Sequence, residues 1–378
     1  MNHQIFATAD FFKKLSSRHV TTYILSFGLL TLLLGTGRFI ILPTQATREL
    51  TWSTNQFPLS TNLLAKSTKI IYVNPTLGSD NPGTDKKETA SYRTITFAVQ
   101  QAQAGTTIQL APGTYSPSSG EQFPLVVKPG VILQGNESTK GQNVLIRGGG
   151  AYLSRTFASQ NIAVVAQQGS EIKGITVTNP NSRGTGVWIE SGNPIIQNNT
   201  FVNSLREGIF VTGHAVPKII GNVFTQNQGN GLSVAKAAQG EIRGNMFSNT
   251  GFGIVISETA TPLAIENTII NNKVGVVISH SAHPVLRQNR IENNQQYGVI
   301  AIAEAQPDLG TASSPGNNIL RHNGQYDLYN LTNCEILMVS GSEIGISMRG
   351  KVEFPPEQSV EESPQVNMTT TARSCKSK

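Results

Sequence analysis

The chain has 378 residues, 14% of them charged, and a formal net charge of +6 at pH 7. Its basic residues are scattered singly and form no stripe interleaved with aromatic residues, so nucleic-acid binding is not expected. Its two cysteines, Cys334 and Cys375, are too few and too far apart for a disulfide framework or a metal site.

The first part of the chain predicts export. Residues 1–19 are polar and basic, and residues 20–42 are apolar except for Arg38. The apolar segment fits a secretory signal peptide and is also long enough to span a bilayer as a signal anchor. The positive-inside rule places the preceding basic residues in the cytoplasm and the rest of the chain outside it. Cleaved signal and uncleaved anchor both remain open, and residues 43–69 are expected to be a linker.

Residues 70–116 predict a strand, a helix and a second strand. An apolar run at 70–73 is followed by a loop rich in Gly, Pro and Asp. An amphipathic helix is expected over residues 95–104, ending at Gly105, and a strand follows at 108–110.

From there a glycine recurs every 22 or 23 residues and opens a short apolar run each time. The six glycines are Gly186, Gly208, Gly231, Gly253, Gly275 and Gly298. A period in this range predicts a stacked architecture, and such short runs leave no room for helices. One period fits one turn of a coil with three strands and three bends. We therefore predict an all-β fold, a right-handed parallel β-helix of about nine coils over residues 117–346.

The sequence predicts different structures at the two ends of this stack. An open coil end exposes unpaired strand edges and core, and the helix of residues 70–116 is expected to cap the first coil. Residues 347–378 are rich in Pro, Glu, Ser and Thr and lack periodicity, so they are expected to be disordered.

Aligned positions within the repeat predict two internal ladders. One consists of Asn199, Asn222, Asn245, Asn267 and Asn289, and the other, two residues later, of Phe201, Phe224, Phe247, Ile269 and Ile291. The second set is expected to stack in the core at the strand spacing of about 4.8 Å. The asparagines are expected at a bend, because Asn tolerates left-handed backbone and stacked amides pair with one another.

Residues 70–116 also resemble a known family. The matching segments are YVN at 72–74, GSDNPGT at 78–84, YRTI at 92–95, AGTTI at 104–108 and APGTY at 111–115. They are similar to the DUF1565 family, whose domain opens right-handed β-helix proteins. Through the repeat alone, residues 117–330 resemble the pectin-lyase-like superfamily more loosely. The resemblance implies a β-helix in a secreted setting and, more distantly, a carbohydrate-related function.

The coils lack one residue type that catalysis in such folds needs. No Asp occurs between positions 116 and 307. The resemblance implies hydrolases with clustered aspartates, since hydrolysis uses a paired acid and base, and calcium-dependent lyases with acidic ligands. Asp80 and Asp85, in the loop before the helix, are the metal-ligand candidates, with turn formation as the alternative. The pattern argues against an enzyme without deciding the matter, and no cofactor is expected.

One row of polar residues keeps a catalytic alternative open. Lys236, Glu258 and His280 each lie five residues after a repeat glycine and would be neighbours on successive coils. Lysine would neutralise a uronic acid carboxylate while histidine abstracts a proton. The alternative is a surface charge ladder of modest energy. His283 adds an H-x-x-H pair with His280, a metal-binding pattern.

A second row is unusual because it is apolar where a sheet should be polar. Two residues after each glycine stand Trp188, Phe210, Ser233, Val255, Val277 and Ile300. Their neighbours on both sides are expected to face the core, so this row faces outward. An exposed apolar stripe marks a contact surface, and Trp188, Phe210, Val255 and Val277 are candidates for binding sugar rings. The alternative is cover by residues 43–69, by the 307–316 insert or by the C-terminal tail.

Three functions remain from these observations. The first is an extracytoplasmic, non-catalytic β-helix that binds polysaccharide or cell-envelope material. The second is a polysaccharide lyase or related carbohydrate enzyme, and the third is a structural or adhesive surface protein. The expected partners are a polysaccharide or envelope component and, if residues 20–42 are not cleaved, the membrane.

Overall fold

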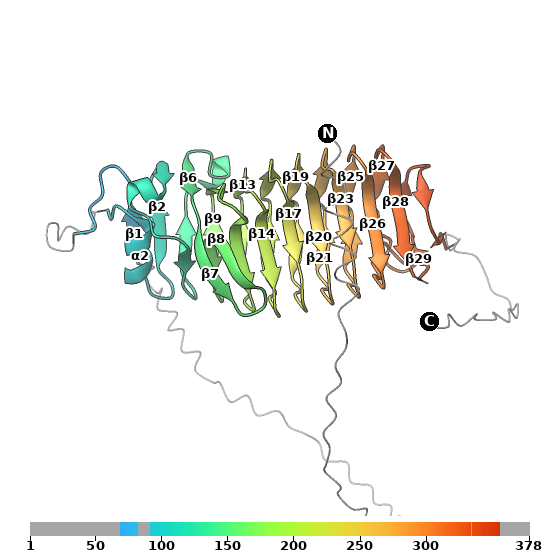
Figure 1. Ribbon diagram of the computed structural model, residues 1–378, viewed down its shortest axis with the longest axis horizontal. Helices are drawn as coiled ribbons and strands as arrows, with labels where there is room; N and C mark the ends of the chain where they lie inside the picture. The colour runs from blue at the N-terminus through green and yellow to red at the C-terminus, as the bar shows by residue number, and fades with distance from the viewer. Residues whose placement is uncertain (1–68, 82–90, 334, 356–378) are drawn as a thin grey trace, which may run out of the picture. The chain divides into compact units, whose positions relative to one another are not determined.

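The computed structural model describes residues 69–81, 91–333 and 335–355, which form a stack of parallel β-coils (Figure 1). Each coil contributes one short strand to each of three sheets, here named A, B and C. The predicted signal or anchor segment, the linker and Asp85 lie outside the described residues. Within those residues, no helix has the length and apolar character needed to cross a membrane.

Sheet A has nine strands and contains the first strand of the described chain. In spatial order its strands are β1 (Ile70–Val73), β2 (Thr107–Leu110), β5 (Ile132–Gln134), β9 (Glu171–Lys173), β12 (Ile195–Gln197), β15 (Lys218–Ile220), β18 (Glu241–Arg243), β21 (Leu263–Ile265) and β24 (Val285–Arg287).

Sheet B has ten strands. They are β3 (Gly113–Tyr115), β6 (Val144–Arg147), β10 (Thr176–Thr178), β13 (Thr200–Val202), β16 (Val223–Thr225), β19 (Met246–Ser248), β22 (Thr268–Ile270), β25 (Arg290–Glu292), β27 (Ile319–Arg321) and β30 (Glu343–Ile344).

Sheet C has eleven strands, one of which, β7 (Gly150–Ser154), pairs antiparallel with β8. The other ten are β4 (Leu125–Val127), β8 (Ala158–Ala166), β11 (Gly184–Glu190), β14 (Glu207–Thr212), β17 (Asn230–Val234), β20 (Phe252–Ile256), β23 (Val274–Ile278), β26 (Tyr297–Ala303), β28 (Tyr326–Thr332) and β31 (Met348–Arg349). A separate parallel pair joins β29 (Leu337–Met338) to β32 (Val352–Glu353). Among the described residues, the helical elements are α2 (Ile95–Gln101) and two 3-10 turns, η1 (Pro117–Ser119) and η2 (Glu137–Thr139).

The core confirms the predicted stacking of like residues. Phe201, Phe224 and Phe247 are fully buried and pair in register on successive coils. Their ring centroids are 5.0 Å apart for the first pair and 4.5 Å for the second, with interplanar angles of 21° and 7°. The three-stranded period is thus a right-handed parallel β-helix, as the repeat predicts.

The predicted asparagine ladder is also present, with one correction to its backbone. The Asn199 amide donates to Ile172 O at 2.9 Å and to Asn222 Oδ1 at 3.0 Å, and the same pattern continues coil by coil to Asn318. Left-handed backbone belongs to the residue before each ladder position, such as Asn198 with φ 54°. The bend therefore turns just before the ladder, which leaves the asparagines free to bridge three coils.

The repeat glycines are required by close backbone approach. A Cβ built on Gly186 would lie 2.5 Å from the carbonyl oxygen of Gly208, and one on Gly208 would lie 2.7 Å from that of Gly231. A side chain would not fit this space without a shift of the backbone, so the six coils from β11 to β26 keep a glycine where sheet C passes its neighbour.

The helix lies at the N-terminal end of the stack, beside β1 (Figure 1). Its residues Ile95, Ala98 and Val99 are buried. The Glu121 carboxylate accepts hydrogen bonds from Ile95 N at 2.7 Å and from Thr96 N at 2.9 Å, which satisfies two backbone donors of the first turn. The helix is therefore tied to the first coil by both apolar and polar contacts.

This helix ends earlier than its sequence pattern predicts. Ala102 is extended, with ψ 143°, so the helix stops at Gln101 instead of Ala104. The Lys128 ammonium donates to Gln100 O at 2.8 Å, which satisfies a carbonyl near the helix end. A turn in which Thr106 N donates to Gln103 O then leads into β2.

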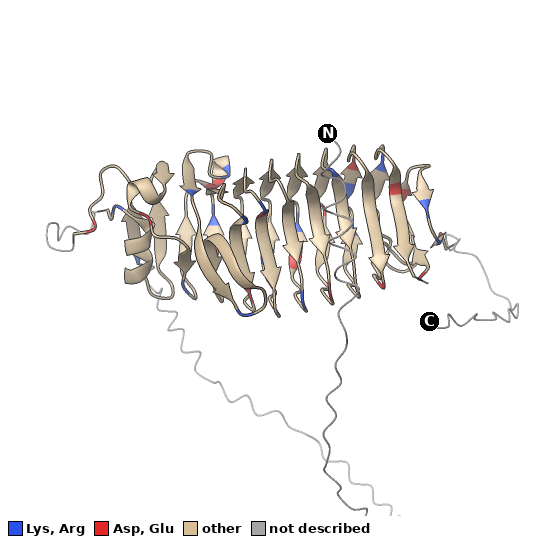
Figure 2. Cartoon of the chain, viewed as in Figure 1, with Lys and Arg blue, Asp and Glu red and all other residues tan. Residues whose placement is uncertain are grey.

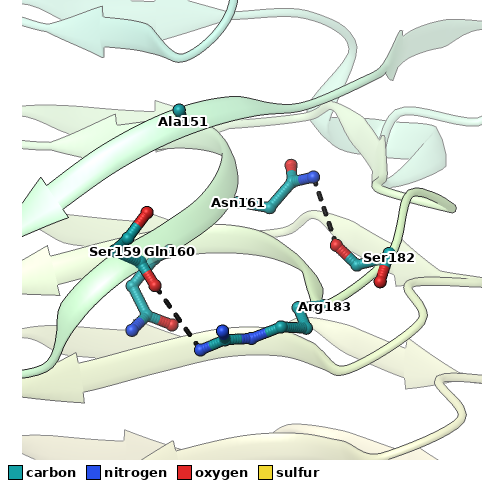
Figure 3. A pocket seen from close by; sticks show the side chains of 6 residues that line it. All are labelled: Ala151, Ser159, Gln160, Asn161, Ser182 and Arg183. Carbon is teal, nitrogen blue, oxygen red and sulfur yellow. Dashed lines mark hydrogen bonds between the residues drawn. The ribbon is translucent and has the colours of Figure 1, made fainter.

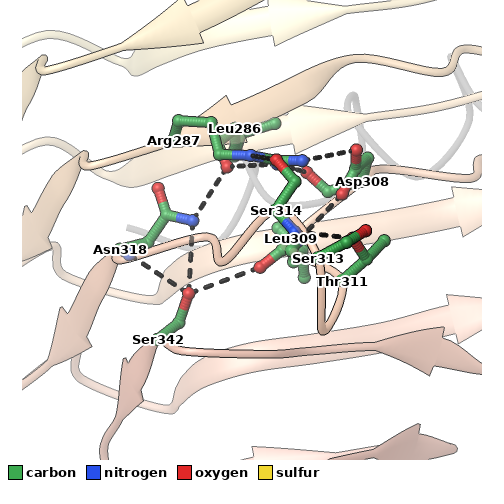
Figure 4. A network of polar contacts seen from close by, with 10 residues as sticks. Leu286, Arg287, Asp308, Leu309, Thr311, Ser313, Ser314, Asn318 and Ser342 are labelled. Atoms are coloured by element: carbon green, nitrogen blue, oxygen red, sulfur yellow. Dashed lines mark hydrogen bonds and ion pairs between the residues drawn. The ribbon is translucent and has the colours of Figure 1, made fainter. Parts of the chain in front are cut away.

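The 307–316 insert packs beside sheet A (Figure 4), and none of its residues belongs to the apolar clusters of the outer face of sheet C. Arg287 forms an ion pair with Asp308 at 2.6 Å, and Asp308 makes a parallel bridge to Val285. Ser342 Oγ donates to Leu309 O at 3.3 Å and accepts from the last ladder asparagine, Asn318. The insert is therefore excluded as the cover of the outer apolar row.

The coil stack also extends beyond the predicted boundary at residue 346. Strands β31 and β32 lie after that position and pair with β28 and β29. The first residues of the segment expected to be disordered are therefore ordered, because they complete the last coil.

Candidate functional site

The outer face of sheet C carries two rows of side chains. One row lies two residues after the repeat glycines and the other lies one residue before them. Val255 and Phe252, which flank Gly253 in this way, belong to the same outer apolar cluster. Strict alternation would place residues three positions apart on opposite faces, so the alternation is interrupted at the glycine. Side chains of both rows point away from the core.

At the N-terminal half of this face the outer row is covered by the chain itself. Trp188 is fully buried and Phe210 is 6% exposed. Their rings stack at 4.5 Å with an interplanar angle of 8°, and Phe157 packs edge-on against both, at 6.3 and 5.1 Å. Phe157 lies at the tip of the β7–β8 hairpin. Of the two alternatives for Trp188 and Phe210, cover by the chain itself therefore applies and a sugar-binding surface does not, but the cover is this hairpin, which is not among the three segments considered from the sequence.

Polar contacts hold the hairpin to the sheet. Glu190 accepts hydrogen bonds from Ser154 Oγ at 3.1 Å, from Tyr152 OH at 3.4 Å and from Trp188 Nε1 at 3.4 Å. Burial, and then the charge of Glu190, raises the pKa of Tyr152, so its hydroxyl remains a donor. The Lys236 ammonium lies 5.0 Å from the Phe157 ring centre, at cation–π distance.

A small polar pocket lies where the hairpin leaves the coil (Figure 3). It has a volume of about 240 Å³ and is lined by Ala151, Ser159, Gln160, Asn161, Ser182 and Arg183. Asn161 Nδ2 donates to Ser182 O at 3.2 Å and Arg183 donates to Ser159 O at 3.4 Å. These bonds join the hairpin to the bend before β11. The pocket therefore lies between the hairpin and the coil that it covers, and its polar residues hold the hairpin in place.

A buried carboxylate lies under the same hairpin. Glu207 has a side chain only 3% exposed and forms an ion pair with Arg206 at 2.9 Å. Thr185 Oγ1 donates to it at 2.8 Å, and Arg206 donates onward to Gln160 of β8 at 2.8 Å. Burial raises the pKa of Glu207 and outweighs the opposing effect of the arginine.

The C-terminal half of the outer face has no such cover among the described residues. Its apolar cluster contains side chains of β20, β23, β26 and β28 only. We call this surface the tyrosine face and define it by Phe252, Val255, Val277, Tyr297, Ile300, Tyr326, Tyr329 and Arg349. Val277 and Ile300 are 7% exposed, and the aromatic rings are half-buried.

The rings of the tyrosine face are held in a fixed arrangement. Tyr297 and Tyr326 lie on paired strands with parallel planes, at 2° and 6.2 Å between centroids. Tyr329 packs against both at 5.5 and 5.2 Å. The Arg349 guanidinium lies 5.8 and 5.4 Å from the Tyr326 and Tyr329 centroids and donates to Tyr326 OH at 3.3 Å. The face thus combines flat apolar rings with hydroxyl and guanidinium groups.

Two of the predicted binding residues, Val255 and Val277, belong to this face, but its aromatic residues were not among the sequence candidates. Phe252 and Tyr297 stand directly before a repeat glycine, in the row that strict alternation assigns to the core. Tyr326 and Tyr329 lie in a coil where Asp327 replaces the glycine. The sequence feature that could have indicated them is the presence of aromatic residues, Phe252 and Tyr297, directly before two of the repeat glycines.

The structure brings together only part of the Lys236, Glu258 and His280 row. Lys236 and Glu258 form an ion pair at 3.0 Å between half-exposed side chains. His280 Nδ1 instead contacts Ser279 Oγ at 3.1 Å. All three residues have left-handed backbone, with φ of 58–60°, because they share the bend that ends each strand of sheet C. Their alignment is thus a property of the bend.

The metal candidates have other partners. Asp80 accepts hydrogen bonds from Arg93 N, Thr94 N and Thr94 Oγ1 at 2.7 to 3.1 Å, immediately before α2. His283 bonds to Gln306 and to Ser281 O. Within the part of the chain that the structure describes, no three His, Cys, Asp or Glu side chains gather as a metal site would require.

Charged residues lie mainly at the bends between strands, and the broad sheet in view carries few of them (Figure 2). The apolar and aromatic tyrosine face is therefore bordered by bends that carry charged residues of both signs. Surfaces of this kind suit ligands that offer both apolar faces and hydroxyl groups.

Several solved structures are similar to this chain. Pectate lyase Pel9A is 12% identical with a TM-score of 0.48, covering 73% of this chain and 78% of that chain. The periplasmic alginate epimerase AlgG is 14% identical with a TM-score of 0.39, at 66% and 73% coverage. Dettilon tailspike protein is 13% identical with a TM-score of 0.44, at 76% and 68% coverage. No curated protein matches the chain.

The family model described as "Protein of unknown function (DUF1565)" matches residues 76–344. This match extends far beyond the N-terminal segment on which the sequence resemblance depends, and it runs from the loop after β1 to the end of β30. The chain therefore belongs to the DUF1565 family.

Proposed function

We propose that this protein is a non-catalytic, extracytoplasmic β-helix that binds polysaccharide along its tyrosine face. The observation that carries the proposal is the contrast between the two halves of sheet C. One aromatic pair, Trp188 and Phe210, is sealed by the chain's own hairpin, whereas Tyr297, Tyr326 and Tyr329 have no covering element among the described residues. Half-exposed rings fixed in position stack on the apolar faces of sugars at low entropic cost.

The spacing of the coils supports a polymeric ligand. Side chains on successive coils repeat about every 4.8 Å along the stack. Tyr297 and Tyr326 offer parallel rings on neighbouring strands, and Phe252 continues the same row. A chain of sugar rings running along the stack would meet one equivalent position on each coil.

The acidic groups of the coils support the absence of catalysis. No Asp occurs between positions 116 and 307. The buried Glu207 is paired with Arg206, and the buried Glu292 is held by Arg290 and Arg321 at 2.6 and 2.7 Å. The side chains of these two carboxylates are only 3% and 2% exposed, so neither is placed to reach a polysaccharide on the surface. The extracytoplasmic setting is supported by the basic and then apolar character of the first 42 residues.

The test is retention of the full chain on a panel of cellulose, chitin, peptidoglycan, alginate and polygalacturonate. A Tyr297→Ala, Tyr329→Ala double variant should lose at least about tenfold in affinity, since two stacking rings contribute about 1 kcal/mol each. Tyr72→Ala is the matched control, because Tyr72 is 44% exposed on β1 and lies outside the tyrosine face. The proposal fails if nothing on the panel is retained, or if control and double variant behave alike.

A second candidate function, a polysaccharide lyase, is favoured by the Lys236–Glu258 pair at 3.0 Å. It would release unsaturated product that absorbs in the ultraviolet from alginate or polygalacturonate, and Lys236→Ala would abolish that release. Under the binding proposal, neither the protein nor this variant produces such absorbance.

A further inference from the structure

The last coil of the stack leaves its core positions open. Ile344, Met348 and Val352 pair with Leu320, Leu328 and Leu337 of the preceding coil. Those three leucines are 0 to 2% exposed, whereas Met348 is 39% exposed and the other two are only partly buried. Side chains in core register are therefore in contact with solvent at this end.

The strand edges are open at the same place. Among the described residues, β30 and β31 are the terminal strands of sheets B and C, and β32 has β29 as its one partner. An exposed parallel edge with apolar side chains is a template for pairing with another chain. The end face thus offers both backbone hydrogen-bonding groups and apolar surface.

Exposed apolar residues concentrate in this region. Six of the thirteen exposed large apolar side chains of the described residues fall between 331 and 354. They are Leu331, Ile336, Met338, Ile346, Met348 and Phe354, and Ile346 has a relative exposure of 104%. A concentration of exposed apolar side chains in one part of the fold indicates an interaction surface.

We propose that this end of the stack docks against the same end of a second copy of the chain. A head-to-tail contact is obstructed because α2 lies over the first coil, where Ile95, Ala98 and Val99 are buried. A two-fold contact between C-terminal ends uses the same surface twice and closes after two copies.

The charges and the following sequence favour this occupant. Arg349 and Lys351 lie on the same rim as Glu343 and Glu353, and all four are exposed. A two-fold rotation places such a mixed rim against itself with opposite charges in reach. Two residues after the end of β32 stands Pro355, which cannot donate to a strand ladder.

Antiparallel pairing of β31 with its copy would continue sheet C across the contact. The two tyrosine faces would then form one longer surface. The dimer itself does not depend on the proposed polysaccharide binding, because its apolar contacts lie outside the tyrosine face and the two surfaces share only Arg349.

Sedimentation velocity of the detergent-solubilised full chain over a range of concentrations tests the proposal. The protein should form a dimer, and Met348→Lys should weaken its dissociation constant at least about tenfold, because it places a charge in the buried contact. Met246→Lys is the matched control, since Met246 is 40% exposed on the side of the stack. Ile346→Lys serves as a second end-face variant whose fully exposed side chain plays no part in folding.

Three results would overturn the proposal. The first is a monomer at every concentration. The second is a dimer that both end-face variants and the control leave equally intact. The third is a chain truncated after Pro355 that dimerises while the full chain stays monomeric, which would identify residues 356–378 as the occupant of the end face.

Discussion

The residue before each repeat glycine has a different surrounding on each coil. Glu207 lies under the hairpin, fixed by Arg206 and Thr185, whereas Tyr297 stands at the equivalent position on the open half. The close backbone contact at the glycine is the same in these coils. Whether the side chain before the glycine is covered depends on segments outside the repeat, such as the hairpin.

The buried Glu207 should make the free energy of unfolding depend on pH. Its pKa in the folded state is raised by burial. Between the ordinary glutamate pKa and this raised value, the folded state holds a proton that the unfolded state has released. Stability from this group is therefore complete below the ordinary glutamate pKa and is lost as pH rises through the raised one. Glu207→Gln should flatten the decline of the free energy of unfolding in this window.

Urea unfolding at a series of mildly acidic to neutral pH values measures this slope. Glu343→Gln is the control, because its carboxylate is 58% exposed. Some slope should remain in Glu207→Gln, since burial also raises the pKa of Glu121. An unchanged slope in Glu207→Gln would show that the carboxylate titrates alike in both states.

At the scale of elements, the β7–β8 hairpin decides which part of sheet C is accessible. It is the antiparallel exception in a set of parallel sheets and interrupts the repeat between β4 and β11. Its aromatic tip and its contacts with Glu190 and Thr212 seal the Trp188–Phe210 pair. The hairpin thus separates a covered aromatic surface from an open one.

Phe157→Ala should unseal this pair. The loss of two edge-on ring contacts and of buried area is expected to destabilise the protein by about 2 kcal/mol and to admit water to Trp188. Trp188 fluorescence should shift to longer wavelength in the folded protein. Leu153→Ala, on the same hairpin but 80% exposed, should leave the emission unchanged. Equal spectra for the two variants would mean that Phe157 does not shield the indole.

At the scale of the whole molecule, the coils form a quasi-one-dimensional stack in which each coil contacts its two neighbours. Two amide ladders run along it. The first ends at Ser342 and the second, through Asn272, Asn294 and Asn323, ends at the Asp327 carboxylate. Stability in such an array is a sum of nearest-neighbour contacts, so damage should remain local.

Phe224→Ala tests this locality. Removing a fully buried ring from the middle of the phenylalanine ladder should cost about 3–5 kcal/mol. Hydrogen exchange should accelerate most in β13, β16 and β19, and least near α2. Phe252→Ala, which removes a half-buried ring from the outer face, should produce a smaller and shallower change. Uniform acceleration along the stack would show a single cooperative unit instead.

The fold could be derived from the sequence because its cause is local and repeated. In the six regular coils a glycine stands where the backbone of one coil approaches the next, and alternating apolar residues place Phe201 and its equivalents in the core. The three-strand coil and the ladders follow from that periodicity, whereas the family resemblance rests on the motifs of residues 72–115. The left-handed bend residues were assigned one position too late, because many residue types occupy them.

The candidate site could be derived only in part, because accessibility is not a periodic property. The outward orientation of the Trp188 row is visible in the repeat. Its burial depends on the hairpin, whose sequence belongs to no repeat, and the tyrosine face depends on a reset of strand alternation at each glycine. Periodicity by itself thus determined what each coil is, and tertiary structure alone decided which surfaces stay open, since cover comes from segments that are close only after folding.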